Sequence, residues 1–312
     1  MRLTSRPTAF VTGADGFLGG ELVQRLVALG HQVAALASSV EAAERLRRAG
    51  ATPVPGDLTR PGRWQDEAAA DWVFHLPSVR RARVLSNIRP ATTMAHHRLT
   101  LDAHLLDAVS AGPTRQVVYV AEAGLYGAAG PYPVTEDEPR PTRSGRWLLP
   151  VIERLESCAL AGLPIVVAIP GCVYGHGGWF QERIAEPVMA GRRVLHLGAR
   201  GPLVSPVHVH DCVRALVHLA SLGSPGHRYF IANSDPVRIY QLASTFARLA
   251  RRPLRAWRVP PIASRLVVGL DQWCCPERDA VFANIRLRGL GFRFEYPTVD
   301  LGVEHVFRIL YE

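Results

Sequence analysis

The chain has 312 residues, a formal net charge of +9 at neutral pH and a hydrophobic content of 48%. These values predict a globular protein of one large domain or two, and no apolar run reaches the roughly 18 residues that a membrane helix requires. The positive charge is spread along the chain without an aromatic-rich basic motif, so we expect no nucleic-acid partner. All 36 residues of the Lys+Arg count are arginine, so no lysine is available for any role.

Cysteine spacing and the N-terminal residues bear on the cellular location. The five cysteines lack the spacing of zinc ligands or of a disulfide framework. No apolar signal-peptide core precedes the first predicted strand, which begins at Ala9. We therefore expect a cytoplasmic protein without a structural metal and without contact with a membrane.

Buried strand-like runs alternate with amphipathic helical segments through the first half of the chain. This alternation predicts an α/β fold of the Rossmann type, a doubly wound parallel sheet with helices on both faces. Residues 127–141 are rich in Pro and Gly and are predicted to form a loop. The predicted strands are 9–12, 33–36, 72–76, 117–120 and 165–169, and the predicted helices are 17–29, 41–49, 99–110 and 151–160.

The pattern loosens beyond about residue 174, where Pro and Gly interrupt it repeatedly. Two later helices are predicted at 239–251 and 298–310. We predict a dinucleotide-binding Rossmann domain over residues 1–173 and a smaller C-terminal lobe over 174–312. This second part would mainly bind substrate, with some segments returning to the Rossmann core.

A glycine-rich turn, TGADGFLGG, follows the first predicted strand. In this context Gly13 permits a tight turn, Gly16 lets the backbone approach a pyrophosphate, and Gly19 lets the next helix pack closely. A strand, this turn and a helix in succession predict a dinucleotide site. The predicted cofactor-binding residues of the turn are Thr12, Gly13, Asp15, Gly16, Phe17, Leu18 and Gly19.

Further short motifs follow in a fixed order along the chain. They are GDL at Gly56–Leu58, HLPS at His75–Ser78, GLYG at Gly124–Gly127, VYG at Val173–Gly175 and VHVHD at Val207–Asp211. With the glycine-rich turn, these motifs resemble the extended short-chain dehydrogenase/reductases of the NAD-dependent epimerase/dehydratase family over nearly the whole chain. The resemblance implies further cofactor contacts from Asp57 and Leu58 and from His75, Leu76 and Pro77.

The end of the second predicted strand bears on the choice between NAD and NADP. This strand leads into Ser38 and Ser39 and offers no carboxylate for the ribose hydroxyls of NAD. Arg45 could reach a 2′-phosphate from the following helix. We therefore expect NAD(P), with NADP slightly favoured, Ser38 in contact with the adenosine ribose, and the dinucleotide in a structural or a redox role.

The resemblance also implies a catalytic Ser or Thr, Tyr and Lys, and the chain departs from all three. Counting from the motifs places these positions on Glu122, Gly145 and Leu149. Pro150 fits only the first turn of a helix, so the predicted helix at 151–160 would begin later than in relatives. Without the lysine, a tyrosine would keep its proton near a pKa of about 10 and be a poor base.

Glu122 is therefore the leading candidate for the catalytic acid or base. At the end of a central strand, an apolar pocket would raise its pKa by desolvation. An equally open alternative is a structural ion pair with Arg146 or another arginine. Further candidates for the catalytic site are Tyr126, Tyr174, Arg146 and His176, with His75 and His176 as proton carriers.

These departures predict an atypical enzyme acting on a small, largely apolar metabolite. The position of the usual diphosphate-binding Arg falls on Val204, with Arg200 the nearest cation, which disfavours a nucleotide sugar. The leading hypothesis is acid/base chemistry such as dehydration, isomerisation or cyclisation. Two alternatives stay open, an oxidoreductase or epimerase with a replaced proton relay and a cofactor-binding sensor or scaffold. The predicted helices 99–110 and 151–160 could also support a homodimer.

Overall fold

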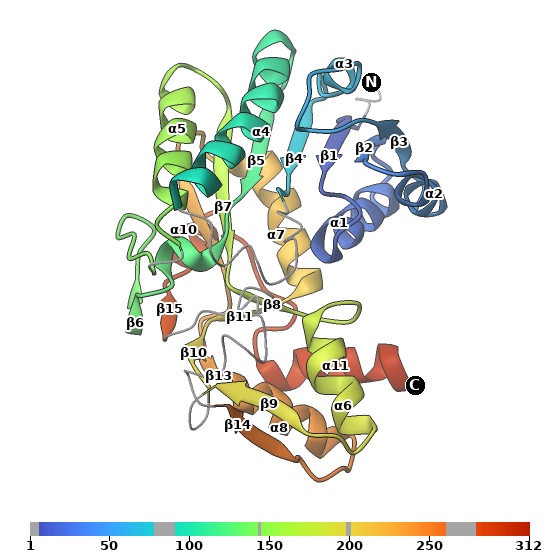
Figure 1. The fold of residues 1–312 in the computed structure, drawn as a ribbon, viewed down its shortest axis with the longest axis vertical. Helices are drawn as coiled ribbons and strands as arrows, with labels where there is room; N and C mark the ends of the chain where they lie inside the picture. Colours follow the sequence, from blue (N-terminus) through green and yellow to red (C-terminus); the bar gives the residue numbers. More distant parts are fainter. Residues whose placement is uncertain (1–5, 78–90, 143–144, 198–200, 260–278) are drawn as a thin grey trace.

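The computed structural model describes residues 6–77, 91–142, 145–197, 201–259 and 279–312 (Figure 1). It confirms the predicted Rossmann-type α/β fold. A seven-stranded parallel sheet with helices on both faces forms the larger part, here called the sheet domain, and a smaller part, the lobe, lies at its carboxyl edge (Figure 1). Within the described residues, no helix combines the length and the hydropathy that crossing a membrane demands.

The central sheet has the strand order β12-β7-β5-β4-β1-β2-β3, and all neighbouring strands are parallel. Most of its strands are short, continuous apolar runs, because helices cover both faces of a sheet of this kind. The strands are β1 Ala9–Thr12, β2 Val33–Ala37, β3 Thr52–Pro55, β4 Trp72–His75, β5 Gln116–Val120, β7 Ile165–Pro170 and β12 Arg228–Ile231.

Two hydrophobic clusters fill the space between the sheet and its helices. One face packs against α3, α4 and α5, and the other against α1, α2, α7 and α10. Ser39 begins α2 by accepting a hydrogen bond from the backbone N–H of Ala42. The helices are α1 Phe17–Ala28, α2 Val40–Arg48, α3 Trp64–Glu67, α4 Ala91–Ala111, α5 Leu148–Leu160, α7 Val209–Leu222 and α10 Ile285–Gly289.

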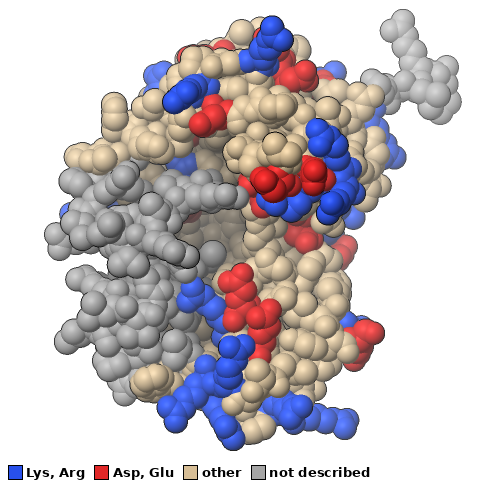
Figure 2. All heavy atoms as spheres, turned by 45° about the vertical axis from the view of Figure 1, so that its right-hand side comes forward, with Lys and Arg blue, Asp and Glu red and all other residues tan. Residues whose placement is uncertain are grey.

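The lobe has its own hydrophobic cluster, built largely from α6, α8 and α11 and from the turn that precedes α6. Its elements are the π-helical turn Gln181–Ala185, α6 Glu186–Met189, α8 Ile239–Leu249, α11 Val299–Tyr311, β9 Val194–Leu197 and β14 Ala256–Val259. Figure 2 shows that one face of the molecule is hollowed between its upper and lower parts.

Short strands join the sheet domain to the lobe. A four-stranded sheet has the order β13-β10-β15-β6, and β8 pairs with β11. Because β12 lies in the central sheet, the chain returns to the sheet domain after residue 174; the boundary between 173 and 174 stays a prediction. These strands are β6 Gly130–Val134, β8 Cys172–Tyr174, β10 Leu203–Val204, β11 Pro206–His208, β13 Val237–Arg238 and β15 Ala280–Phe282.

The predicted loop at 127–141 is wrong in part, because β6 lies within it. This strand contains Pro131 and Pro133 and, among the described strands, pairs with β15 alone, at the edge of the four-stranded sheet. An edge strand tolerates Pro because one side of its backbone needs no ladder partner. The composition that indicated a loop is therefore also the composition of an edge strand.

Two helix boundaries differ from the expected ones in ways that affect the site. Helix α4 begins at Ala91 rather than at residue 99, so it includes Arg98. Helix α5 begins at Leu148, which places Pro150 in its first turn, where a missing N–H costs nothing.

Candidate functional site

The glycine-rich turn joins β1 to α1 at the carboxyl edge of the sheet. Gly13 has a φ of +67°, and a Cβ there would lie 2.0 Å from the backbone oxygen of Leu76. A Cβ on Gly19 would lie 2.1 Å from the Gly13 oxygen. The first backbone N–H groups of α1 have no partner within the helix, so they form a cradle for an anionic group. This backbone arrangement fits a dinucleotide pyrophosphate.

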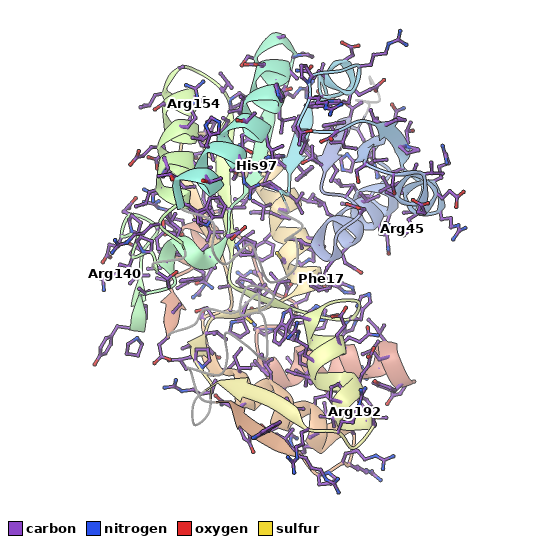
Figure 3. All side chains as sticks on the ribbon, in the orientation of Figure 1. Phe17, Arg45, His97, Arg140, Arg154 and Arg192 are labelled. Carbon is purple, nitrogen blue, oxygen red and sulfur yellow. The ribbon has the colours of Figure 1, made fainter. Side chains whose placement is uncertain are left out.

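The other end of the predicted dinucleotide site lies at β2 and β3. Ser38 follows β2, and the Arg45 guanidinium on α2 lies 3.9 Å from the Asp15 carboxylate of the turn. Figure 3 shows Arg45 on the outer side of the sheet domain and Phe17 at the N-terminal end of α1. Exposed Asp57 follows β3 and accepts a hydrogen bond from the Thr59 N–H, which lowers the pKa of its carboxyl.

A buried polar network connects β1, β4, α4 and β5. Thr12 Oγ1 lies 2.6 Å from His75 Nδ1, His75 Nε2 lies 2.9 Å from Asp102, and the Tyr119 hydroxyl donates to Asp102 at 2.8 Å. An ionised Asp102 only accepts, so His75 Nε2 carries the proton and Thr12 donates to Nδ1. Burial lowers the pKa of His75, against the opposing effect of Asp102.

Hydrogen bonds within the protein therefore occupy both ring nitrogens of His75. Its side chain is fully buried and both ring nitrogens are used, so the role of proton carrier expected for it is wrong. Leu76 is also buried and Pro77 is half-buried. A dinucleotide could contact this stretch chiefly through its backbone.

Arg98 is a buried cation at the edge where β4 and β5 end. Its side chain is 2% exposed, and its Nη2 donates to the carbonyl of Pro77 and lies 3.8 Å from the Glu122 carboxylate. Its guanidinium also lies 5.7 Å from the centre of the Trp147 ring, over its face. Within the described part of the chain, Nε and Nη1 have no hydrogen-bond partner. Arg98 therefore offers two charged donors to a ligand.

Glu122 lies where the sequence predicted it, at the end of β5, but its surroundings differ from the expected ones. Its side chain is 41% exposed and its partner is Arg98, so the enclosed apolar environment is not observed. The alternative of an ion pair with an arginine agrees with the structure, but the partner is Arg98; Arg146 is exposed and forms no such pair among the described residues. Glu122 and Arg98 form a carboxylate–guanidinium pair with one member in contact with solvent.

The position that counting assigned to the tyrosine has no room for a side chain. A Cβ on Gly145 would lie 2.1 Å from the backbone oxygen of Gly124. Leu149, at the lysine position, packs against the core of the sheet domain. The start of α5 therefore contacts the turn after β5 directly, through two glycines.

The remaining candidate residues lie elsewhere. The Tyr126 hydroxyl donates to the Glu136 carbonyl and accepts from Arg228, with its pKa raised to about 12 by burial, and the Tyr174 hydroxyl lies against Gly302 of α11, so both are taken up by packing inside the protein. His176 contacts Glu21 rather than Glu122. Val204 is buried in β10, and Arg200 lies outside the described residues.

Arg98 is the residue that sequence reasoning missed. Its signal was an arginine four residues before Asp102 on what becomes the buried face of α4, but the predicted helix began one residue after it. Because the predicted helix started at residue 99 and α4 starts at Ala91, Arg98 fell outside the predicted helix.

The fold and this site define a Rossmann-type dinucleotide-binding protein, and comparison with known proteins gives its family. The profile of the NAD dependent epimerase/dehydratase family matches residues 9–232, so the chain belongs to this family. It is 30% identical over 272 residues to 4-hydroxy-2-methyl-3-oxo-4-farnesyl-3,4-dihydroquinoline-1-oxide ketoreductase of Stigmatella aurantiaca, covering 84% of this chain and 79% of that protein.

Another relative supports this family, and a solved structure shares the fold. The chain is 30% identical over 269 residues to 3-diazoavenalumate denitrifying reductase of a Streptomyces species, covering 82% of this chain and 86% of that protein. The structure of dTDP-glucose 4,6-dehydratase from Bacillus anthracis in complex with NAD superposes with a TM-score of 0.78 at 13% identity, over 96% and 95% of the two chains. At that identity the likeness concerns the fold alone.

Proposed function

We propose that this protein is an NAD(P)H-dependent reductase of a small, largely apolar carbonyl metabolite, and that Arg98 and Glu122 serve its reaction. The observation that carries the proposal is the buried guanidinium of Arg98 with two unused donors in the described structure. A cation held out of water costs several kcal/mol unless something compensates it, which favours a site that receives negative charge. The two relatives at 30% identity are both named as reductases.

The glycine-rich turn and the N-terminus of α1 would hold the pyrophosphate. NADP is the slightly favoured dinucleotide, because Arg45 lies beside Asp15 and the end of β2 offers hydroxyls and no carboxylate. The reduced nicotinamide, when bound, supplies the hydride. The network of Thr12, His75 and Asp102 would fix the end of β4 against β1 and so hold the wall of the site in place.

Arg98 and Glu122 would act on the carbonyl oxygen of the substrate. Negative charge develops on this oxygen as a carbonyl is reduced, and Arg98 Nε and Nη1 could donate to it. Glu122 could pass a proton from water to this oxygen, because its side chain is half exposed. Neither step needs a tyrosine or a lysine.

The substrate would be a metabolite without a diphosphate. Val204 replaces the expected cation and is buried, so this position offers nothing to a phosphate. The cytoplasm remains the expected location, and a homodimer through α4 and α5 remains the expected assembly.

Turnover of the reduced cofactor with substrate tests the proposal. We would follow the absorbance of NADPH with a panel of aromatic and polyketide-type ketones, and compare Arg98→Met and Glu122→Gln with the exposed controls Arg154→Met and Glu153→Gln. We expect both site variants to lower kcat by about 100-fold or more. The controls should keep it, and NADPH affinity should stay unchanged in all four. Loss of activity only on changing the exposed residues would reject the site.

A second candidate is acid/base chemistry without net redox, such as dehydration, isomerisation or cyclisation. The half-exposed Glu122 beside a fixed cation favours it, since such a pair can move a proton and stabilise an enolate. Product formation at constant NADPH would establish this candidate in place of the reductase. Tight dinucleotide binding without turnover of any compound would instead indicate a sensor or scaffold.

A further inference from the structure

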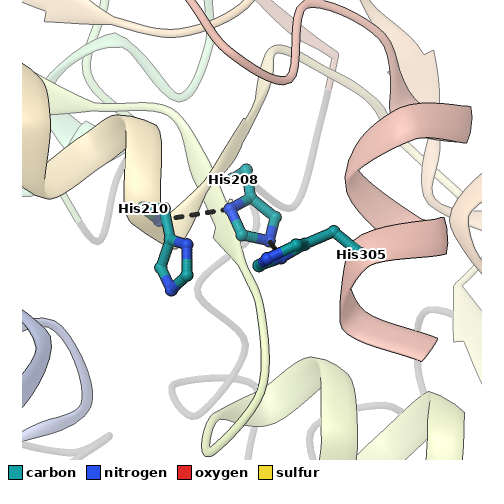
Figure 4. A group of neighbouring side chains, drawn as sticks. All are labelled: His208, His210 and His305. Carbon is teal, nitrogen blue, oxygen red and sulfur yellow. Dashed lines mark hydrogen bonds between the residues drawn. The ribbon is translucent and has the colours of Figure 1, made fainter. Parts of the chain in front are cut away.

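A second cluster of titratable side chains lies outside the Arg98–Glu122 pair, where α1 meets the segment after β8 and the start of α7. It consists of one carboxylate and four imidazoles, and Figure 4 shows three of the histidines. These five side chains come from five separate segments and include groups spaced closely enough to hold a metal ion: Glu21, His176, His208, His210 and His305.

Glu21 connects two of these histidines. Its Oε1 lies 3.0 Å from His176 Nε2, and its Oε2 lies 3.6 Å from His210 Nε2. The ligand atoms of the three residues all lie within 4.8 Å of one another. Two ligands of a tetrahedral zinc ion, each about 2.0–2.1 Å from the metal, lie roughly 3.3–3.5 Å apart. The observed spacing therefore needs only small side-chain movements to close around an ion.

We propose that Glu21, His176 and His210 form a binding site for one divalent transition-metal ion. Two imidazoles and a carboxylate are a ligand set that suits Zn²⁺ and leaves a position for water or another ligand. The elements that carry them are well anchored. A Cβ on Gly175 would lie 2.5 Å from a side-chain carbon of Val209, and one on Gly178 would lie 3.0 Å from the Phe17 ring.

The imidazole of His176 is only partly used by the protein itself. Its Nδ1 is buried and has no hydrogen-bond partner among the described residues, in contrast to His75, which uses both ring nitrogens. The nitrogen beside Glu21 is Nε2, so an ion bound there would replace the Nε2 proton and leave Nδ1 as the protonated nitrogen.

The neighbouring group of His208, His210 and His305 has suitable spacing but unsuitable hydrogen bonds. The backbone N–H of His210 donates to His208 Nδ1 at 3.2 Å, so this nitrogen carries no proton. Neutral His208 must then carry its proton on Nε2, which lies 3.3 Å from His305 Nδ1 and donates to it (Figure 4). A metal on His208 Nε2 would break this bond. It would also move the proton to Nδ1, which would then face the backbone N–H of His210, so two donors would point at each other.

A metal at the Glu21 site would connect the two parts of the molecule. Glu21 lies on the helix that begins at the glycine-rich turn, whereas His176 lies in the segment that leads into the lobe. An ion bound only by the folded chain stabilises it by mass action. We therefore expect Zn²⁺ to raise the Tm of the protein.

Zinc titration of the untagged full-length chain tests this site. Calorimetry with Zn²⁺ should give one ion per chain, and the Tm should rise with Zn²⁺ and fall again with a chelator. Glu21→Gln and His176→Gln should each weaken binding by about 100-fold or more, beyond the effect usual for outer hydrogen-bond partners of a metal ligand. The matched control is His305→Gln, which belongs only to the neighbouring group and should leave the affinity within about threefold.

Circular dichroism of each variant without metal would confirm that it folds. Should Glu21→Gln fail to fold, His176→Gln carries the test, because the His176 side chain is partly exposed. Absence of saturable one-to-one binding by the unmodified chain would overturn the proposal. So would loss of zinc in His305→Gln together with its retention in Glu21→Gln and His176→Gln, which would assign the metal to the His208 group.

Discussion

Two regions lie at the same edge of the sheet, on either side of β4. The region at the end of β1 is formed by backbone, and the region at the end of β5 is formed by side chains. At the end of β1, Gly13 leaves no room for a side chain because the backbone of Leu76 is in contact with it. At the end of β5, Gly124 and Gly145 are in similar contact, but polar groups come from Glu122 and, on α4, from Arg98. A site made of backbone constrains its residues to glycine, whereas a site made of side chains can be rebuilt from another helix.

Replacing Gly13 with Ala should have the largest effect on this contrast. The new Cβ meets the Leu76 backbone at 2.0 Å and the φ of +67° disfavours any side chain, so we expect a loss of about 4 kcal/mol in unfolding free energy and of dinucleotide binding. Gly162→Ala is the matched control, because its φ is +99° with no atom within 4 Å. Urea unfolding should show at most about 2 kcal/mol there. Equal costs at the two positions would mean that contact with Leu76 is unimportant.

Restoring a tyrosine and a lysine tests the other region. In Gly145→Tyr/Leu149→Lys the new Cβ at 145 must displace the backbone of Gly124, so we expect a loss of about 3 kcal/mol and no gain in turnover. Leu149→Lys alone separates the cost of a lysine at this partly buried position from the cost of the tyrosine. A folded double variant with increased activity would show that the backbone of this region still accommodates a catalytic Tyr and Lys, and that only the side chains differ.

The buried network between the two regions should make stability depend on pH. Burial lowers the pKa of His75 in the folded chain. As the pH falls below about 6.5, His75 therefore becomes protonated in the unfolded chain while it stays neutral in the folded chain. This contribution is present above pH 6.5 and decreases as the pH falls through and below 6.5. Urea unfolding across this range should show a smaller slope in His75→Gln. The exposed control His97→Gln should keep the slope of the unmodified chain.

The smallest expected effect concerns the adenosine end of the dinucleotide site. Arg45→Gln should weaken NADPH binding by about tenfold, or about 1.4 kcal/mol, with little change for NADH, because only NADPH carries the 2′-phosphate. Arg48→Gln lies on the same helix and pairs with Glu44, which makes it the control. Calorimetric titration measures both. A similar loss for both cofactors would remove Arg45 from the phosphate site.

Local patterns were sufficient for the sheet domain and insufficient for the reaction site. The predicted helix at 17–29 and the observed α1 differ by one residue at the end, because a glycine-rich start and an apolar face specify this helix locally. Helix α4 was predicted too short, since its first turns include His96, His97 and Arg98, which indicate neither burial nor an apolar face. Placing a charged side chain in the interior requires knowledge of its partners.

The sequence by itself determined the family fold, the dinucleotide turn and the absence of any lysine, because strand alternation and glycine spacing are local and directly visible. Only the tertiary structure decided that Arg98 lies beside Glu122, that Gly145 is pressed against Gly124, and that Glu21 contacts His176 and His210. These contacts join residues from different elements, and their chemistry depends on burial and distance. Neither quantity can be obtained from residue spacing along a single chain.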